Sequence, residues 1–379
     1  MKTKTLSLSI LLVAVILLTA CGPSAEQIAT MTASAWTPTP KPTNTPLPTA
    51  TATPVPYDLT VKVTDADGNP IAGALVVFPQ SGNEEPVAVD DSGQAAWTDL
   101  DGPAGTVTVA AQGYFKGEQS FNLNRGPNEI VLKLERDPFG LLPSDACGAG
   151  ESLLYVEDYQ DGEAQDWRGQ ANNPGTAFVG PASDEAANSV WTIDATKITE
   201  YGDNAWLGAN YGNGNQGREP GLFGDAVWRM RFMLSRPTAP SLNWHELANP
   251  REPIQIGDQD YGGAGYSFHF MGGQSQIQVN RNLNSITGEP VSGDRVDSGP
   301  FKQVAMQWHS MELSMFQGNI QLWIDGKPVI DFTDPEPIPP GGIGIWIGPF
   351  TAESLTVMYF DDIRVCGLSA PFASAFVAP

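Results

Sequence analysis

The chain has 379 residues, of which 41% are hydrophobic, enough to bury a core and to divide into more than one domain. Its 43 acidic and 20 basic residues give a formal net charge of -23, which repels the phosphate backbone of nucleic acids. Nucleic acid is therefore excluded as a partner. An acidic surface serves solubility and also favours divalent cations such as calcium.

The first twenty residues, 1–20, have the features of a secretory signal peptide. Residues 1–4 carry two lysines, and residues 6–18 form an apolar run too short to span a bilayer. Residues 18–21, Leu-Thr-Ala-Cys, resemble the bacterial lipobox, in which small residues before a cysteine permit cleavage and acylation of the thiol. The resemblance implies that Cys21 carries acyl chains such as palmitate. We therefore expect a lipoprotein anchored in a membrane at the cell surface.

Residues 21–56 are predicted to be a disordered, lipid-anchored linker. Within them, residues 37–56 alternate threonine and proline so often that no apolar periodicity remains. Proline favours extended polyproline II, in which about twenty residues span roughly 60 Å at about 3.1 Å per residue. The linker is expected to hold the following domains clear of the membrane.

Residues 57–135 predict a small β-sandwich of six or seven strands. Short runs alternate apolar and polar residues, and turn-forming residues separate them. The pattern Asp-x-x-Gly-x-Pro-Ile-x-Gly-Ala begins at Asp65 and resembles the carboxypeptidase regulatory-like domains, a transthyretin-like family. The resemblance implies a spacer or a module that binds proteins or sugars. The pair Asp65 and Asp67 is interpreted as turn chemistry in preference to a cation loop.

Residues 145–368 predict a larger jelly-roll β-sandwich, followed by a C-terminal tail at 369–379. This region holds eight of the ten tryptophans and shows no helical periodicity. Strands are predicted at 153–159, 227–234, 254–256, 266–270, 277–280, 311–315, 320–324, 343–347 and 355–365. The chain is thus expected to be all-β.

Both ends of this region resemble the concanavalin A-like lectin and glucanase family, which includes laminin-G-like modules. The opening residues 157–162, Glu-Asp-Tyr-Gln-Asp-Gly, are similar to the acidic and aromatic start of that family. Residues 320–329 resemble its strand, Asp-Gly turn and strand, and residues 359–365 its closing strand. The resemblance implies a jelly roll that binds carbohydrate or cell-surface polysaccharide.

No catalytic residue is nominated, because enzymes of this family need carboxylates spaced as Glu-x-Asp-x-x-Glu, and the sequence lacks that pattern. The histidines His245, His269 and His309 are each isolated in sequence, and we expect them to be packed or hydrogen-bonded. A non-catalytic carbohydrate-binding or adhesive module is favoured. A divergent glycan hydrolase and a structural surface scaffold stay open as alternatives.

Two further expectations concern the ends of the jelly roll. Once Cys21 is acylated, Cys147 and Cys366 remain in an oxidising compartment, and the family resemblance brings their strands together, so a disulfide is predicted. In the related folds a structural calcium ion links the opening acidic segment to the closing strand. The resemblance therefore implies calcium ligands at Asp361 and at Glu157 or Asp158.

The last expectation is a sugar-binding platform. Strand alternation separates Trp323 and Trp346 from the isoleucines of their strands, so both indoles are expected on one exposed surface. An indole offers apolar area to a pyranose, and nearby amides can bond its hydroxyls. The alternative is that both tryptophans cover an outer sheet face or pack under loops. The amides nominated are Gln276, Gln278 and Gln321, and the tryptophans expected in the core are Trp167, Trp228 and Trp308.

Overall fold

The computed structural model describes residues 55–82, 84–164, 167–171, 176–196, 198, 207–211, 223–237, 240–248, 253–347 and 355–374. The predicted signal peptide, Cys21 and most of the linker lie outside these ranges. Within them the helical segments are two short 3-10 turns, Pro79–Ser81 and Pro143–Asp145. No helix in the described part is long and apolar enough to cross a membrane. The all-β prediction is confirmed.

The first sandwich has two sheets, with strand orders β4-β1-β7 and β3-β2-β5-β6. Alternation within β1 puts Leu59, Val61 and Val63 into the core, where Val107 and Val109 of β5 join them. Six or seven strands were predicted for this domain, and the structure has seven. They are β1 (Tyr57–Thr64), β2 (Leu75–Val77), β3 (Val87–Ala88), β4 (Gln94–Leu100), β5 (Ala104–Ala110), β6 (Gly117–Asn122) and β7 (Gly126–Lys133).

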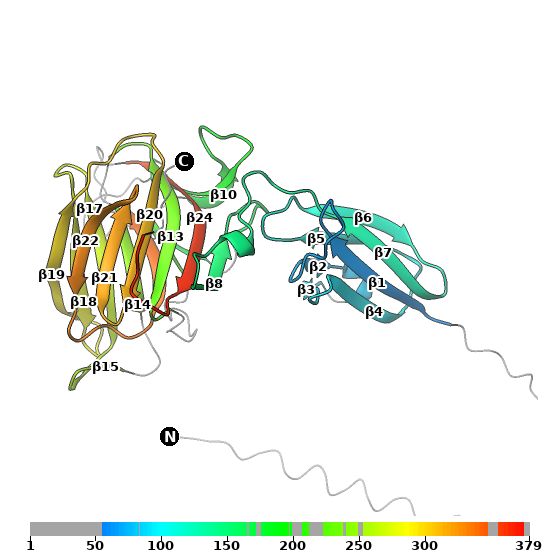
Figure 1. Cartoon of the computed structure of the whole chain (residues 1–379), viewed down its shortest axis with the longest axis horizontal. Coiled ribbons are helices and arrows are strands. Elements are labelled where there is room, and N and C mark those ends of the chain that lie inside the picture. The colour runs from blue at the N-terminus through cyan, green and yellow to red at the C-terminus, as the bar shows by residue number, and fades with distance from the viewer. Residues whose placement is uncertain are drawn as a thin grey trace, which may run out of the picture. The chain divides into compact units, whose positions relative to one another are not determined.

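The second sandwich packs an eight-stranded sheet against a seven-stranded sheet (Figure 1). The eight-stranded sheet contains β8 (Ser152–Glu157), β10 (Thr176–Pro181), β11 (Ser189–Asp194), β13 (Ala226–Leu234), β20 (His309–Phe316), β21 (Asn319–Ile324), β22 (Lys327–Thr333) and β24 (Val357–Gly367). The seven-stranded sheet contains β9 (Arg168–Ala171), β12 (Leu207–Tyr211), β14 (Pro240–Ala248), β17 (Gly263–Met271), β18 (Gln276–Asn284), β19 (Pro290–Pro300) and β23 (Gly342–Ile347).

Strand alternation builds the core between these two sheets. Ile343, Ile345 and Ile347 of β23 are fully buried, and Trp228 and Trp244 stack 6.1 Å apart, one from each sheet. A separate hairpin, β15 (Ile254–Ile256) and β16 (Gln259–Tyr261), lies between β14 and β17 in the sequence. The core is aliphatic and aromatic on its inner faces, which leaves the polar side chains of each strand on the outer faces.

The predicted Asp-Gly turn between β21 and β22 is confirmed. Asp325 and Gly326 have φ angles of 51° and 70°, as the favoured two-residue hairpin turn requires. The predicted disulfide between Cys147 and Cys366 is also present, with the two Cα atoms 5.8 Å apart. It joins the segment before β8 to the end of β24, and such bonds persist in oxidising, extracytoplasmic compartments.

Candidate functional site

The two tryptophans predicted to share a platform lie on different sheets. Trp346 belongs to β23 in the seven-stranded sheet and Trp323 to β21 in the eight-stranded sheet, and both are half-buried on outer faces. Because the outer faces of a sandwich point away from each other, no single surface can present both indoles. The shared platform is therefore a wrong prediction. Alternation identifies the face of a strand that is polar, but not the sheet to which the strand belongs.

The outer face of the eight-stranded sheet near Trp323 is occupied by other parts of the chain. Trp323 donates its indole hydrogen to Gln321 at 3.1 Å and lies opposite Glu312 in the ladder. The C-terminal tail crosses here, because the Phe372 ring lies 5.7 Å from the Arg229 guanidinium and Ser374 donates a hydrogen bond to Glu312. The side chains on this part of the outer face are therefore in contact with other residues of the protein.

Trp346 begins a row of side chains that crosses the seven-stranded sheet. In the ladder Trp346 lies opposite Ser241, Ser241 opposite His269, and His269 opposite Gln278. Residues paired in an antiparallel ladder project from the same face, so the four side chains form one outward row. The indole Nε1 of Trp346 is itself buried and has no hydrogen-bond partner among the described residues, so the exposed part of this side chain is its carbon surface.

A second row runs beside the first and consists of amides and hydroxyls. Asn243 lies opposite Ser267, and Ser267 opposite Asn280, while Asn282 is two residues further along β18. Asn282 donates to the Ser267 hydroxyl at 2.7 Å, and that hydroxyl contacts His269 Nε2 at 2.9 Å. We call the two rows together the amide face: Ser241, Asn243, Ser267, His269, Gln278, Asn280, Asn282 and Trp346.

His269 is the one titratable side chain of the amide face. Burial lowers the pKa of its imidazole, so the ring is neutral at pH 7. The Ser267 hydroxyl thus links the Asn282 amide to the His269 ring, since it accepts a hydrogen from Asn282 and shares a hydrogen bond with Nε2 of His269. This histidine is hydrogen-bonded, as expected for each of the three, but the sequence did not place it among amides.

The other two histidines are packed into the structure. His245 is buried and both of its ring nitrogens lie against backbone carbonyls, those of Ile338 at 2.9 Å and Gly224 at 3.1 Å. His309 is buried and contacts Asp325 at 2.8 Å. Neither lies on the amide face, and the packed interpretation is confirmed for both.

A cavity of about 120 Å³ indents the sheet at the end of the amide face. Its wall combines a carboxylate, Glu246, with three amides, and Gly265 lies at its base, where a Cβ would approach the Glu246 Cα to 3.4 Å. Amides offer both a donor and an acceptor, so a cluster of them can bond vicinal hydroxyls from two sides. The remaining lining residues are Asn243, Leu247, Ala264, Tyr266, Asn282 and Asn284.

In the described part of the chain, Glu157, Asp158 and Asp361 do not form a group of three closely spaced ligand atoms. Among the described residues, the one group of three or more acidic, histidine or cysteine ligand atoms within 4.8 Å of one another includes Cys147 and Cys366, which are already joined in the disulfide. Glu157 accepts the backbone hydrogen of Tyr159 at 2.8 Å and lies opposite Ile363, two residues after Asp361 on β24. Glu157, Asp158 and Asp361 therefore lie near one another but have hydrogen-bond partners within the protein, and calcium at these positions stays a proposal.

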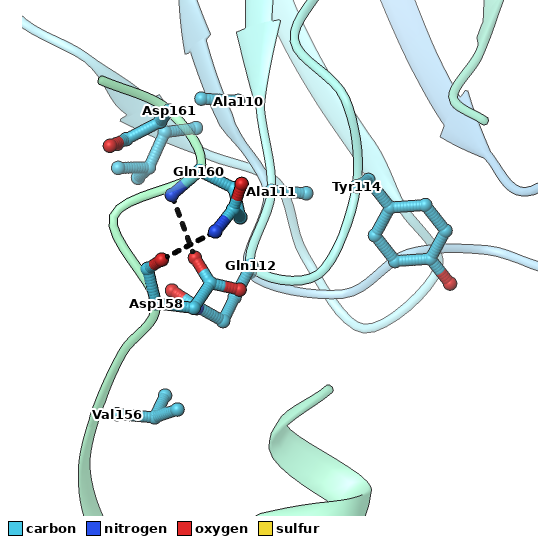
Figure 2. Close-up of a pocket in the computed structure, with 10 residues that line it drawn as sticks. Ala110, Ala111, Gln112, Tyr114, Val156, Asp158, Gln160 and Asp161 are labelled. Carbon is cyan, nitrogen blue, oxygen red and sulfur yellow. Dashed lines mark hydrogen bonds between the residues drawn. The ribbon is translucent and has the colours of Figure 1, made fainter. Parts of the chain in front are cut away.

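Asp158 lines a second cavity, of about 220 Å³, with residues of the first sandwich such as Gln112 and Tyr114 (Figure 2). Its two carboxylate oxygens accept the backbone hydrogens of Leu141 at 2.7 Å and Gln160 at 3.2 Å. Burial raises the pKa of this carboxyl. Asp158 therefore holds the chain on either side of it through backbone hydrogen bonds.

Asp361 forms an ion pair with the guanidinium of Arg231. Its Oδ2 accepts hydrogen bonds from Arg231 Nη2 at 2.6 Å and from Asn188 at 3.0 Å, and the side chain is fully buried. The guanidinium of Arg231 also lies 3.2 Å from the carboxylates of Glu185 and Asp362. Three carboxylates from the loop after β10 and from β24 thus converge on one arginine, where sequence resemblance had predicted a metal ion.

Two of the three tryptophans expected in the core are buried, and the third lies at the surface. Trp167 and Trp228 are buried, as predicted. Trp308 is half-buried at the surface, where its ring lies 4.5 Å from the Arg231 guanidinium and its indole hydrogen is shared with Asp184. Its assignment to the core was wrong, because it precedes β20 and stacks on the arginine instead of entering the sandwich.

Comparison with known proteins gives matches to solved structures alone. No family model matches the sequence, and no curated protein matches it. Three of the matched structures are a protein of unknown function with a galectin-like fold from Bacillus subtilis, an endo-beta-1,4-glucuronan lyase from Trichoderma reesei, and the carbohydrate-binding module CBM66 from Bacillus subtilis. In the same order, the identities are 12, 15 and 11%, and the TM-scores are 0.37, 0.39 and 0.31. They cover 57, 57 and 53% of this chain and 97, 96 and 94% of the matched chain. At these sequence identities and TM-scores, no functional residue of those proteins can be assigned to a residue of this chain.

Proposed function

We propose that the protein binds carbohydrate through the amide face of the seven-stranded sheet. The observation that carries this proposal is the outward row of Trp346, Ser241, His269 and Gln278 beside the hydrogen-bonded amides of β14 and β18. Sugar recognition needs an aromatic ring for the C-H face and paired donors and acceptors for hydroxyls. The amide face supplies both on rigid strands, where side chains are held at fixed spacings.

A glycan array probed with the full-length protein tests this function. Binding to at least one class of glycan is expected, with a dissociation constant between micromolar and millimolar. A parallel assay for released sugar separates binding from hydrolysis. Binding without product supports the proposal, product formation supports the alternative of a divergent hydrolase, and no binding to any glycan leaves the structural scaffold.

The cavity beside the amide face favours binding over glycoside hydrolysis. Hydrolysis by the common mechanism requires two carboxyl groups flanking the bond, about 5 to 9.5 Å apart. The described lining of the 120 Å³ cavity contains one carboxylate, Glu246. We infer a non-catalytic role for this surface.

We propose that the protein is displayed at the cell surface as a lipoprotein. The lipobox-like residues before Cys21 and the Thr/Pro-rich linker support this proposal, together with the extracytoplasmic disulfide. Cys21→Ser is expected to abolish incorporation of labelled palmitate. Labelling of the variant at the level of the unchanged protein would contradict lipidation at Cys21.

We infer that Arg231 supplies the positive charge that a calcium ion would supply between Asp361, Asp362 and Glu185. The melting temperature of the protein is therefore expected to be the same, within about 1 °C, in chelator and in excess calcium. Calcium at Glu157, Asp158 and Asp361 is the competing proposal. A calcium-dependent rise of several degrees would support that proposal and contradict the role given to Arg231.

A further inference from the structure

A third cavity, which we call the hairpin cavity, lies beyond the amide face at the end of β18 and differs from that face in chemistry. It measures about 350 Å³ and is formed by the β15–β16 hairpin and the turn between β18 and β19. Asn284 lines the 120 Å³ cavity and the next residue, Ser285, lines this one, so consecutive residues at the end of β18 contribute to the two cavities. The other lining residues are Gln259, Asp260, Tyr261, Ile286, Thr287 and Val291.

The hairpin cavity presents apolar side chains to solvent. Ile286 is 65% exposed and Val291 is 57% exposed, and they are the two most exposed large hydrophobic residues of the jelly-roll region described. Tyr261 donates its hydroxyl hydrogen to Gln259 at 2.8 Å, which fixes the ring at the cavity wall. Exposed apolar side chains that line a cavity mark a binding site more often than isolated surface ones do. A ligand that extends from the amide face into this cavity would therefore contact the apolar side chains of Ile286 and Val291.

The charges around both cavities exclude one class of glycan. Each cavity has one acidic lining residue, Glu246 in the smaller and Asp260 in the larger, and the described lining of neither includes a lysine or arginine. The whole chain carries a formal charge of -23. Uronic acids, sulfate esters and phosphate groups would be repelled by this field, so the ligand is neutral.

We propose that the two cavities together bind a neutral glycan that carries acetyl groups. This inference rests on the proposed function of the amide face. The sugar ring and its hydroxyls lie over the amides near Asn282 and Asn284, and the methyl of an acetyl group packs against Ile286, Val291 and Tyr261. A volume of 350 Å³ is within the range of about 300 to 1,000 Å³ that ligand pockets occupy.

Matched pairs of neutral glycans test the inference with the full-length protein. The pairs are β-1,4-linked N-acetylglucosamine and glucose tetrasaccharides, and acetylated and deacetylated xylan. The acetylated member of at least one pair is expected to bind about tenfold more tightly. The Ile286→Ser/Val291→Ser variant is expected to lose this preference while it keeps its affinity for the unacetylated member. Val304→Ser, at a position 43% exposed away from the cavity lining, is the control and should keep the preference.

The outcomes separate the inference from the proposed function. Equal affinity for both members of each pair would overturn the acetyl selectivity and leave carbohydrate binding standing. Binding to neither member of either pair would overturn the inference, and the glycan array then decides the function alone. An acetyl preference that survives in the Ile286→Ser/Val291→Ser variant would also overturn it, because another surface would then hold the acetyl group.

Discussion

Replacing Cys147 with serine is expected to lower the free energy of unfolding by about 2 to 5 kcal/mol. The disulfide joins residues 219 apart in the sequence, and a crosslink that closes so long a loop removes much entropy from the unfolded chain. A domain of this size loses roughly 2 to 4 °C of melting temperature per kcal/mol. Calorimetry of the variant should therefore show the jelly roll melting about 10 °C lower.

Substitution of the other cysteine provides the control for this prediction. Cys366→Ser and the double variant should match Cys147→Ser, since each breaks the same bond. Reduction of the unchanged protein should shift its melting temperature by a similar amount. A variant that melts within 1 °C of the unchanged protein would show that the disulfide contributes little to folding stability.

Replacing Arg231 with methionine is expected to lower the free energy of unfolding by about 3 kcal/mol. The substitution leaves the fully buried Asp361 carboxylate without its cation, and Asp362 and Glu185 nearby add like charge. Urea denaturation of the variant measures this loss. The Arg231→Met/Asp361→Asn double variant removes the uncompensated charge and should regain part of the stability. A double variant no more stable than Arg231→Met would contradict the ion-pair account.

The loss caused by Arg231→Met should depend on pH. Burial, with the neighbouring Asp362, raises the pKa of Asp361 to about 7, above its unfolded value of about 4. The folded state therefore binds this proton more tightly, and the carboxyl favours folding less as the pH rises from about 4 through 7. Without the arginine, protonation is the remaining way to neutralise Asp361, so the variant should lose more stability at pH 8.5 than at pH 5.5.

Strands with strict alternation were predictable from sequence, and polar or irregular strands were not. The runs around Val61 and Leu322 alternate in burial, the run around Ile345 buries all three of its isoleucines, and each was predicted as a strand. Strand β14 escaped prediction because a bulge with a positive φ at His245 breaks its alternation, and β19 because exposed charged and small residues fill an edge strand.

The candidate site was predicted in part. Sequence alternation identified Trp346 as outward-facing, and Gln276 and Gln278 were nominated as nearby amides; the seven-stranded sheet places all three on its outer face. It also grouped Trp323 with them, since pairing between distant strands cannot be derived from local patterns. The contribution of β14 and β17, including Ser241 and His269, depends on that same pairing.

The arginine that pairs with Asp361 could not be predicted from the sequence either. Arg231 and Asp361 are 130 residues apart and meet because β13 and β24 are neighbours in the eight-stranded sheet. Carboxylates at the two ends of the jelly roll were visible as a pattern, but the cation opposite them was not. A resemblance to a family can predict where charge gathers without predicting what neutralises it.

The amide face is tested most directly by comparing two tryptophan variants in binding to one glycan. Trp346 and Trp323 are both half-buried on outer faces, but they lie on opposite sheets, so each is the matched control for the other. With the best ligand from the array and isothermal titration, Trp346→Ala should weaken binding at least tenfold, and Trp323→Ala should leave it unchanged. Loss of binding in Trp323→Ala with full binding in Trp346→Ala would place the site on the other sheet and contradict the account.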